Sequence, residues 1–174
     1  RHTAEKVVDL VIEKLGMKPL PCKTNSTQVT GGQIKNFGEF LSSALQEHLT
    51  MLTPELIDHW VQSYGTEYSK VRVLLDGSEN QVPYTQLSEP VIKAQVIYAV
   101  REEMAVKLSD VLLRRTGIGT VGKPDDSILE DIASTMATEL GWSPAKVKLE
   151  LEEVKAFYRK HGSGDPVVED LEIS

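Results

Sequence analysis

Residues 53–65, Thr-Pro-Glu-Leu-Ile-Asp-His-Trp-Val-Gln-Ser-Tyr-Gly, contain the signals of a complete amphipathic helix. Thr53 is a residue type that caps helix N-termini, and Pro54 follows in the first turn, where no backbone N–H is needed. Gly65 ends the pattern as a C-terminal cap. Between the caps, apolar side chains recur at helical spacing, which predicts one buried face. That face consists of Leu56, Ile57, Trp60, Val61 and Tyr64.

The same helical period continues on both sides of this segment. In residues 66–75 the apolar side chains also alternate as in a strand, but the helical neighbours favour a helix there. The sequence therefore predicts an all-α fold, a compact multi-helix domain of about seven or eight helices. The other predicted helices span 4–15, 36–52, 89–104, 109–116, 125–140 and 143–160.

Cap signals and apolar spacing also predict how these helices begin, end and face the core. Gly16 ends the first helix, Asn36 and Glu39 have capping-box spacing, and Ser109 or Asp110 caps the short helix. Apolar residues at helical spacing in the first helix are Ala4, Val8, Val11 and Leu15. In the later helices they are Val91, Ile92, Val96, Ile97, Val100, Met104, Ile128, Ile132, Met136, Leu140, Val147, Leu151, Val154 and Tyr158.

The length of 174 residues is enough for one domain with its own core. We expect residues 1–160 to form the helical domain and 161–174 to be an acidic, mobile tail. The first residue is Arg1 rather than Met, and helical periodicity follows almost at once. We therefore expect this sequence to come from within a longer protein.

Charge and hydropathy exclude several classes of partner. The chain has 26 acidic and 19 basic residues, a net charge of −7, and no basic stripe interleaved with aromatics, so nucleic acid is not expected. Its apolar runs are far shorter than the roughly 20 residues that span a bilayer, so no transmembrane segment is expected. With no secretory signal and only Cys22, a cytoplasmic location is favoured.

Residues 117–122, Gly-Ile-Gly-Thr-Val-Gly, match the dinucleotide-binding pattern G-x-G-x-x-G. In such a site the glycines follow a strand and open a helix that faces the pyrophosphate. Here a predicted helix precedes them, and Lys123-Pro124 interrupts the chain where the binding helix would begin. We interpret the segment as a helix-ending glycine followed by a linker.

Other catalytic patterns are equally weak. Ser143 and Lys146 have the spacing of a Ser–Lys nucleophile pair, but Ser143 has the signals of an N-cap. The four His and the single Cys lack the close spacing of a zinc site. No catalytic, cofactor-binding or metal-binding residue is therefore assigned.

The densest polar cluster begins at Arg101-Glu102-Glu103 and continues to Arg114-Arg115. It is either a network of surface ion pairs, each contributing at most about 1 kcal/mol, or a polar surface that docks the domain onto something else. Composition alone leaves these two interpretations about even.

Two segments of this region resemble a known family. Residues 98–105, Tyr-Ala-Val-Arg-Glu-Glu-Met-Ala, and 108–116, Leu-Ser-Asp-Val-Leu-Leu-Arg-Arg-Thr, resemble the C-terminal domain of FAD-dependent glycerol-3-phosphate dehydrogenases and oxidases. The resemblance extends over essentially residues 1–160. It implies a parent enzyme that oxidises glycerol 3-phosphate to dihydroxyacetone phosphate and passes electrons from FAD to a quinone or to oxygen.

The resemblance further implies that this chain is a non-catalytic accessory domain. FAD would belong to the parent enzyme and not to this segment, which would contact the FAD and substrate domains. The parent would be cytoplasmic or peripheral on the cytoplasmic membrane. The alternative is a free-standing α-helical protein-interaction module. The candidate interdomain contacts are Arg101, Glu102, Glu103, Arg114 and Arg115.

Overall fold

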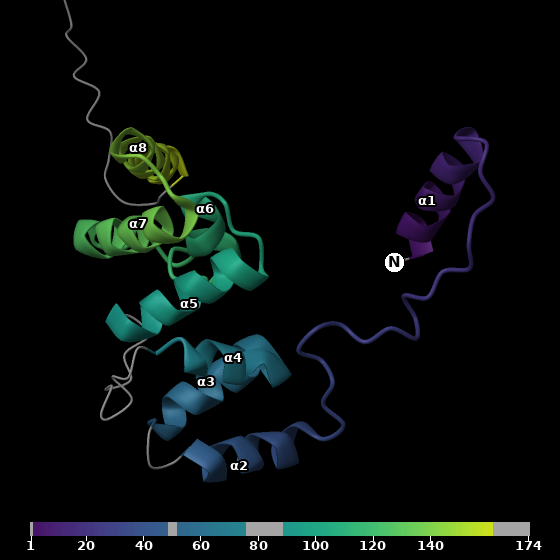
Figure 1. The fold of residues 1–174 in the computed structure, drawn as a ribbon, viewed down its shortest axis with the longest axis horizontal. Helices are drawn as coiled ribbons and strands as arrows, with labels where there is room; N and C mark the ends of the chain where they lie inside the picture. Colours follow the sequence, from purple (N-terminus) through teal and green to yellow (C-terminus); the bar gives the residue numbers. More distant parts are fainter. Residues whose placement is uncertain (1, 49–51, 76–88, 162–174) are drawn as a thin grey trace, which may run out of the picture.

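The computed structural model describes residues 2–48, 52–75 and 89–161, and these form helices without any strand, which confirms the all-α prediction (Figure 1). A 3₁₀ turn, η1 (Gly65–Glu67), and a π-helical segment, η2 (Val111–Arg115), extend α3 and α6. The α-helices are α1 (His2–Lys14), α2 (Phe37–His48), α3 (Pro54–Tyr64), α4 (Tyr68–Val73), α5 (Glu89–Glu102), α6 (Leu108–Asp110), α7 (Asp126–Leu140) and α8 (Pro144–His161).

Helix α5 lies at the centre of the helical body, between two halves of the core (Figure 1). All six side chains of residues 94–99 are buried, so this part of the helix is covered on every side. Ala94 and Tyr98 belong to the cluster formed with α2, α3 and α4. Val96 and Ala99 belong to the cluster formed with α6, η2, α7 and α8.

The segment at 53–65 folds as predicted. Thr53 Oγ1 accepts a hydrogen bond from the Leu56 N–H at 3.4 Å, and Gly65 ends the helix with a φ of 56°. The five residues of its predicted face are all buried. Tyr64 stacks edge-to-face on Tyr98 with ring centroids 5.2 Å apart, which joins α3 to α5. Residues 68–73 are helical, as expected.

The end of α5 differs from the prediction. We expected the helix to reach Met104 and to bury that side chain, but α5 ends at Glu102. Met104 has a φ of 58° and is 83% exposed. The Ala105 N–H reaches back to the Ala99 carbonyl at 3.0 Å, so the chain folds over the end of α5 at the left-handed Met104. This turn places Ala105, rather than Met104, in the core.

The first residues and the buried faces of the later helices also differ in detail from the prediction. α6 begins at Leu108, so Asp110 lies in its first turn and accepts hydrogen bonds from the Val106 and Lys107 N–H groups. In α7, Leu129 and Ala133 share the buried face with Ile132 and Met136. The remaining predicted residues of α7 and α8 that are only partly buried are Ile128, Leu140, Val147 and Leu151.

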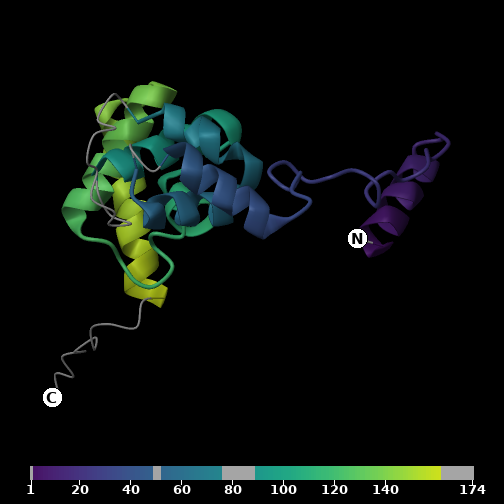
Figure 2. The ribbon, with the colours of Figure 1, turned by 90° about the horizontal axis from the view of Figure 1, so that it is seen from below.

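Helix α1 stands apart from the body (Figures 1 and 2). It ends before Gly16, as predicted, but it contacts no other described helix and none of its residues is buried. The connector at 76–80 and the tail from 162 onward lie outside the described residues.

Two hydrogen bonds from Thr66 hold the linker after α1 against the helical body. The Thr66 N–H donates to the Gly31 carbonyl at 3.0 Å, and the Thr66 hydroxyl bonds Gln33 Oε1 at 3.1 Å. Both Gly31 and Gly65 have positive φ, and a Cβ on Gly65 would overlap the Gly31 carbonyl oxygen. Two glycines are therefore needed where the two backbones cross.

Candidate interdomain surface

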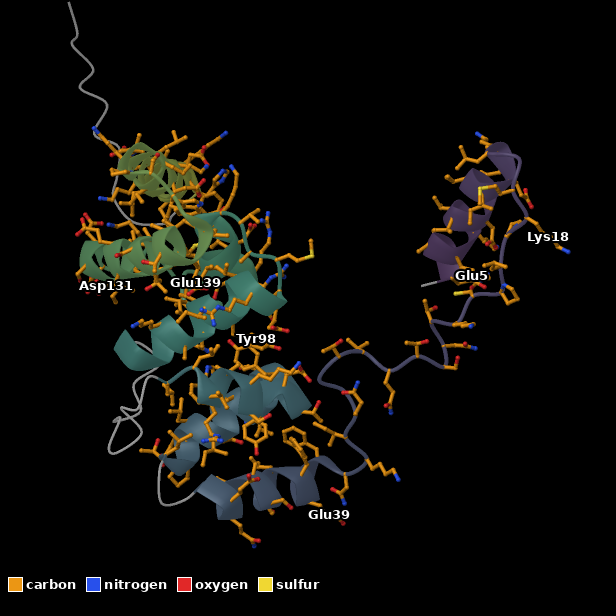
Figure 3. The ribbon with its side chains drawn as sticks, viewed as in Figure 1. Glu5, Lys18, Glu39, Tyr98, Asp131 and Glu139 are labelled. Carbon is orange, nitrogen blue, oxygen red and sulfur yellow. The ribbon has the colours of Figure 1, made fainter. Side chains whose placement is uncertain are left out.

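The three arginines of the predicted contact set all donate hydrogen bonds to partners inside the domain. Arg101 on α5 donates two hydrogen bonds to Glu139 on α7, at 2.6 and 2.9 Å. Glu139 is labelled in Figure 3. Arg114 bonds Asp110 at 2.5 Å along its own helix. Arg115 Nε donates to the Glu103 backbone carbonyl at 3.1 Å. These contacts tie α5, η2 and α7 together.

The two glutamates of the set lie at the C-terminal end of α5, where the helix dipole disfavours negative charge. Glu102 is exposed. Glu103 is partly buried, and its Oε2 atom is enclosed without a hydrogen-bond partner in the described part of the chain. Burial raises the pKa of the Glu103 carboxyl, and the Arg115 charge opposes that shift. Glu103 is therefore the member of the set whose bonding is incomplete.

Replacing Glu103 by glutamine should stabilise the isolated chain at neutral pH, by less than about 1 kcal/mol because the site is partly solvated. Only the folded state bears the cost of enclosing the charge, since its pKa is raised above the ordinary 4.5. The gain should shrink as the pH falls through the folded-state pKa and vanish below 4.5. Urea unfolding across this range measures it, with Glu102→Gln as the exposed control. A gain that persists at low pH would contradict the assignment.

The glycine segment at 117–122 does not fit an FAD pyrophosphate site. It follows the π-helical turn η2 instead of a strand. The Gly119 carbonyl is taken by the Tyr158 hydroxyl, which donates to it at 2.7 Å. The next helix, α7, opens with Asp125 and Asp126, and the Asp126 carboxylate already pairs with Lys123 and Lys155, the two cations nearest this helix start. Gly117 has a φ of 68°, as expected of a glycine that ends a helix, and the residues between it and α7 form no helix.

The remaining candidate residues, Ser143 and Cys22, make only local contacts. Ser143 Oγ accepts a hydrogen bond from the Lys146 N–H at 3.3 Å, as an N-cap does. Cys22 is exposed in the linker. Within residues 2–48, 52–75 and 89–161, no three His, Cys, Asp or Glu side chains come together as metal ligands. Over the same ranges, no helix has the length and hydropathy needed to cross a membrane.

Sequence reasoning missed one buried charge, Glu150 on α8. It is 1% exposed and accepts hydrogen bonds from the Leu108 N–H at 2.8 Å and from Lys146 Nζ at 2.5 Å. The Lys146 pair has ordinary i,i+4 spacing, typical of an exposed helix face. Glu150 differs from its charged neighbours on α8 only because α6 packs against it in the folded domain, which a sequence pattern does not show.

Comparison with known proteins identifies the family. Residues 22–147 match the family described as the C-terminal domain of alpha-glycerophosphate oxidase. The chain belongs to this family. Aerobic glycerol-3-phosphate dehydrogenases of Staphylococcus aureus strains bovine RF122 / ET3-1 and MRSA252 are 27% identical to it over 98% of its length. The enzyme of strain USA300 is 26% identical over the same share.

The family match covers residues 22–147, so it begins after α1 and ends within α8. The chain spans 32% of the length of these relatives. The match to the C-terminal domain family begins at residue 22, so α1 precedes it, while the alignment with the relatives covers nearly the whole chain. The resemblance predicted from residues 98–116 is confirmed.

Proposed function

We propose that this chain is a non-catalytic accessory domain of an FAD-dependent glycerol-3-phosphate dehydrogenase and that it docks against the FAD and substrate domains of the same polypeptide. The observation that carries the proposal is the uncovered apolar face of α1. The complete enzyme would oxidise sn-glycerol 3-phosphate to dihydroxyacetone phosphate. FAD, held by the other domains, would take the electrons and pass them to a quinone or to oxygen. The enzyme would work in the cytoplasm or on the cytoplasmic membrane surface.

Helix α1 carries apolar residues like those of a packed helix, but no other described helix packs against it. Val7, Val8 and Val11 are each about half exposed, at 56%, 54% and 49%, and Leu15 is 69% exposed. A helix of 13 residues is marginal in water and depends on burial of its apolar face. Because α1 precedes the family's C-terminal domain and does not touch it, a surface elsewhere in the parent chain is its natural partner.

Hydrogen exchange on the complete parent enzyme and on this chain alone tests the proposal. The α1 amides should exchange at least roughly 100-fold more slowly in the parent, because docking removes local opening. Val8→Asp should abolish that protection. Lys6→Asp, on an exposed polar position of the same helix, is the matched control and should preserve it.

Two results would overturn the proposal. One is equal exchange of the α1 amides in the parent and in the chain alone. The other is flavin absorbance together with dye-linked glycerol 3-phosphate oxidation by the purified chain, which would make it an enzyme in its own right.

A further inference from the structure

We infer that the linker between α1 and α2 is fastened to the helical body at one crossing point, a clamp that limits how far α1 can reach. The clamp consists of Gly31, Gln33, Gly65 and Thr66. The linker before it, residues 17–30, is then the tether of α1. This inference rests on the proposed function and adds to it the length of chain that α1 has available for docking.

The clamp is held by backbone and side-chain bonds together. The Thr66 N–H donates to the Gly31 carbonyl at 3.0 Å, and the Thr66 hydroxyl donates to Gln33 Oε1 at 3.1 Å. Gly31 is buried, whereas none of residues 17–30 is buried. The chain therefore joins the packed part of the molecule at Gly31, before α2 begins.

Only glycine fits on either side of the crossing. Gly31 and Gly65 have φ values of 83° and 56°, in the left-handed region that favours glycine. A Cβ on Gly31 would lie 2.6 Å from the Tyr64 carbonyl oxygen, and one on Gly65 would lie 2.0 Å from the Gly31 carbonyl oxygen. Both of these neighbours are backbone atoms, so the two backbones would have to separate. The contact is therefore specific to the residues that make it.

The tether itself makes only local contacts (Figures 1 and 2 show its course from α1 to the body). The Ser26 and Thr27 N–H groups bond the Lys23 carbonyl, and no printed bond of the described residues joins 17–30 to a helix of the body. Fully extended, a chain of this length spans about 50 Å, against about 70 Å if the linker were free up to α2. The surface that α1 covers should therefore lie within about 50 Å of the clamp.

Limited trypsin digestion of this chain tests the clamp. Lys18 and Lys23 lie in the tether, Lys35 follows the clamp, and all three are exposed. Exposure alone would make the three sites equivalent. With the clamp closed, cleavage after Lys35 should be at least roughly tenfold slower than after Lys23, because local opening has to precede it. Peptide mass spectrometry over a time course gives the separate rates.

Two glycine variants separate the clamp from other causes of protection. Gly31→Ala opens the clamp from the linker side and changes no residue of α3, so cleavage after Lys35 should become roughly tenfold faster. Gly16→Ala is the matched control, because Gly16 also has a left-handed φ, 73°, but nothing lies within 4 Å of the added Cβ. Its cleavage rates should not change. Cleavage after Lys155 in α8 reports global unfolding and should stay slow in both variants.

Equal cleavage after Lys35 in the two glycine variants would overturn the inference, because the protection would then come from the neighbouring α2. So would cleavage after Lys35 as fast as after Lys23 in the unmodified chain. Neither result bears on the proposed function, which depends on exchange of the α1 amides in the parent. If those amides are unprotected while Lys35 behaves as expected, the clamp stands and the proposed function fails. A structure of the parent with α1 more than about 50 Å from the clamp would contradict the length limit.

Discussion

Gly119→Ala is expected to lower the free energy of unfolding by about 3 kcal/mol, since overpacking costs roughly 1–3 kcal/mol and a buried, unpaired carbonyl a similar amount. A Cβ at this position would overlap the hydroxyl oxygen of Tyr158 and approach Leu112 Cβ to 3.2 Å. Both neighbours are buried, and the Tyr158 hydroxyl is bonded to the Gly119 carbonyl. Moving the tyrosine aside would therefore break that bond. Urea unfolding of the chain measures the loss.

Gly122→Ala is the matched control, because it changes the last glycine of the same G-x-G-x-x-G pattern. No atom lies within 4 Å of the Cβ it would add, and its φ is ordinary, so the effect should stay within about 0.5 kcal/mol. In the double variant Gly119→Ala with Tyr158→Phe, the missing hydroxyl leaves room for the methyl. The two losses should then be less than additive. Equal losses for the two glycine variants would show that Gly119 is not a packing glycine.

The sequence predicted those parts of the fold that depend on local chemistry. In α3 a capping threonine, a first-turn proline and a terminal glycine lie within one segment, and its five apolar residues recur at one period. Both kinds of signal act over a few residues, so no knowledge of neighbouring helices was needed. The apolar residues of 66–75 also alternate as in a strand, but the helical neighbours predicted a helix there, and α4 confirms it.

The features that the sequence could not predict depend on distant contacts. Continuing the helical period to Met104 was reasonable, but burial of Ala105 ends α5 two residues earlier. The partner of Arg101 is Glu139, 38 positions away, so helical spacing could not distinguish that bond from a solvated charge. Likewise, the groove between η2 and α8, lined by Leu112 and Val154, appears only when the two helices are placed together.

Glu150→Ala is the second change with a large expected effect, a loss of about 3 kcal/mol in the free energy of unfolding, because removing one partner of a buried charged contact typically costs 3–5 kcal/mol. Glu150 is buried and accepts the Leu108 N–H at the start of α6. Without it, that backbone donor remains enclosed and unpaired. Lys146 is 37% exposed and can recover its hydration, which keeps the loss near the lower value.

Glu153→Ala provides the comparison, since Glu153 also links α8 to α6, through an ion pair with Lys107 at 3.0 Å. The two side chains of that pair are 46% and 51% exposed, so the loss should be at most about 1 kcal/mol. It should shrink further in high salt. Glu150→Gln keeps an oxygen for the Leu108 N–H and should fall between the two alanine variants. The three values, measured by urea unfolding at low and high salt, separate a buried backbone contact from a surface charge pair. Equal, salt-sensitive losses at both glutamates would mean that Glu150 acts only through Lys146, and that α6 does not depend on a carboxylate from α8 for its first turn.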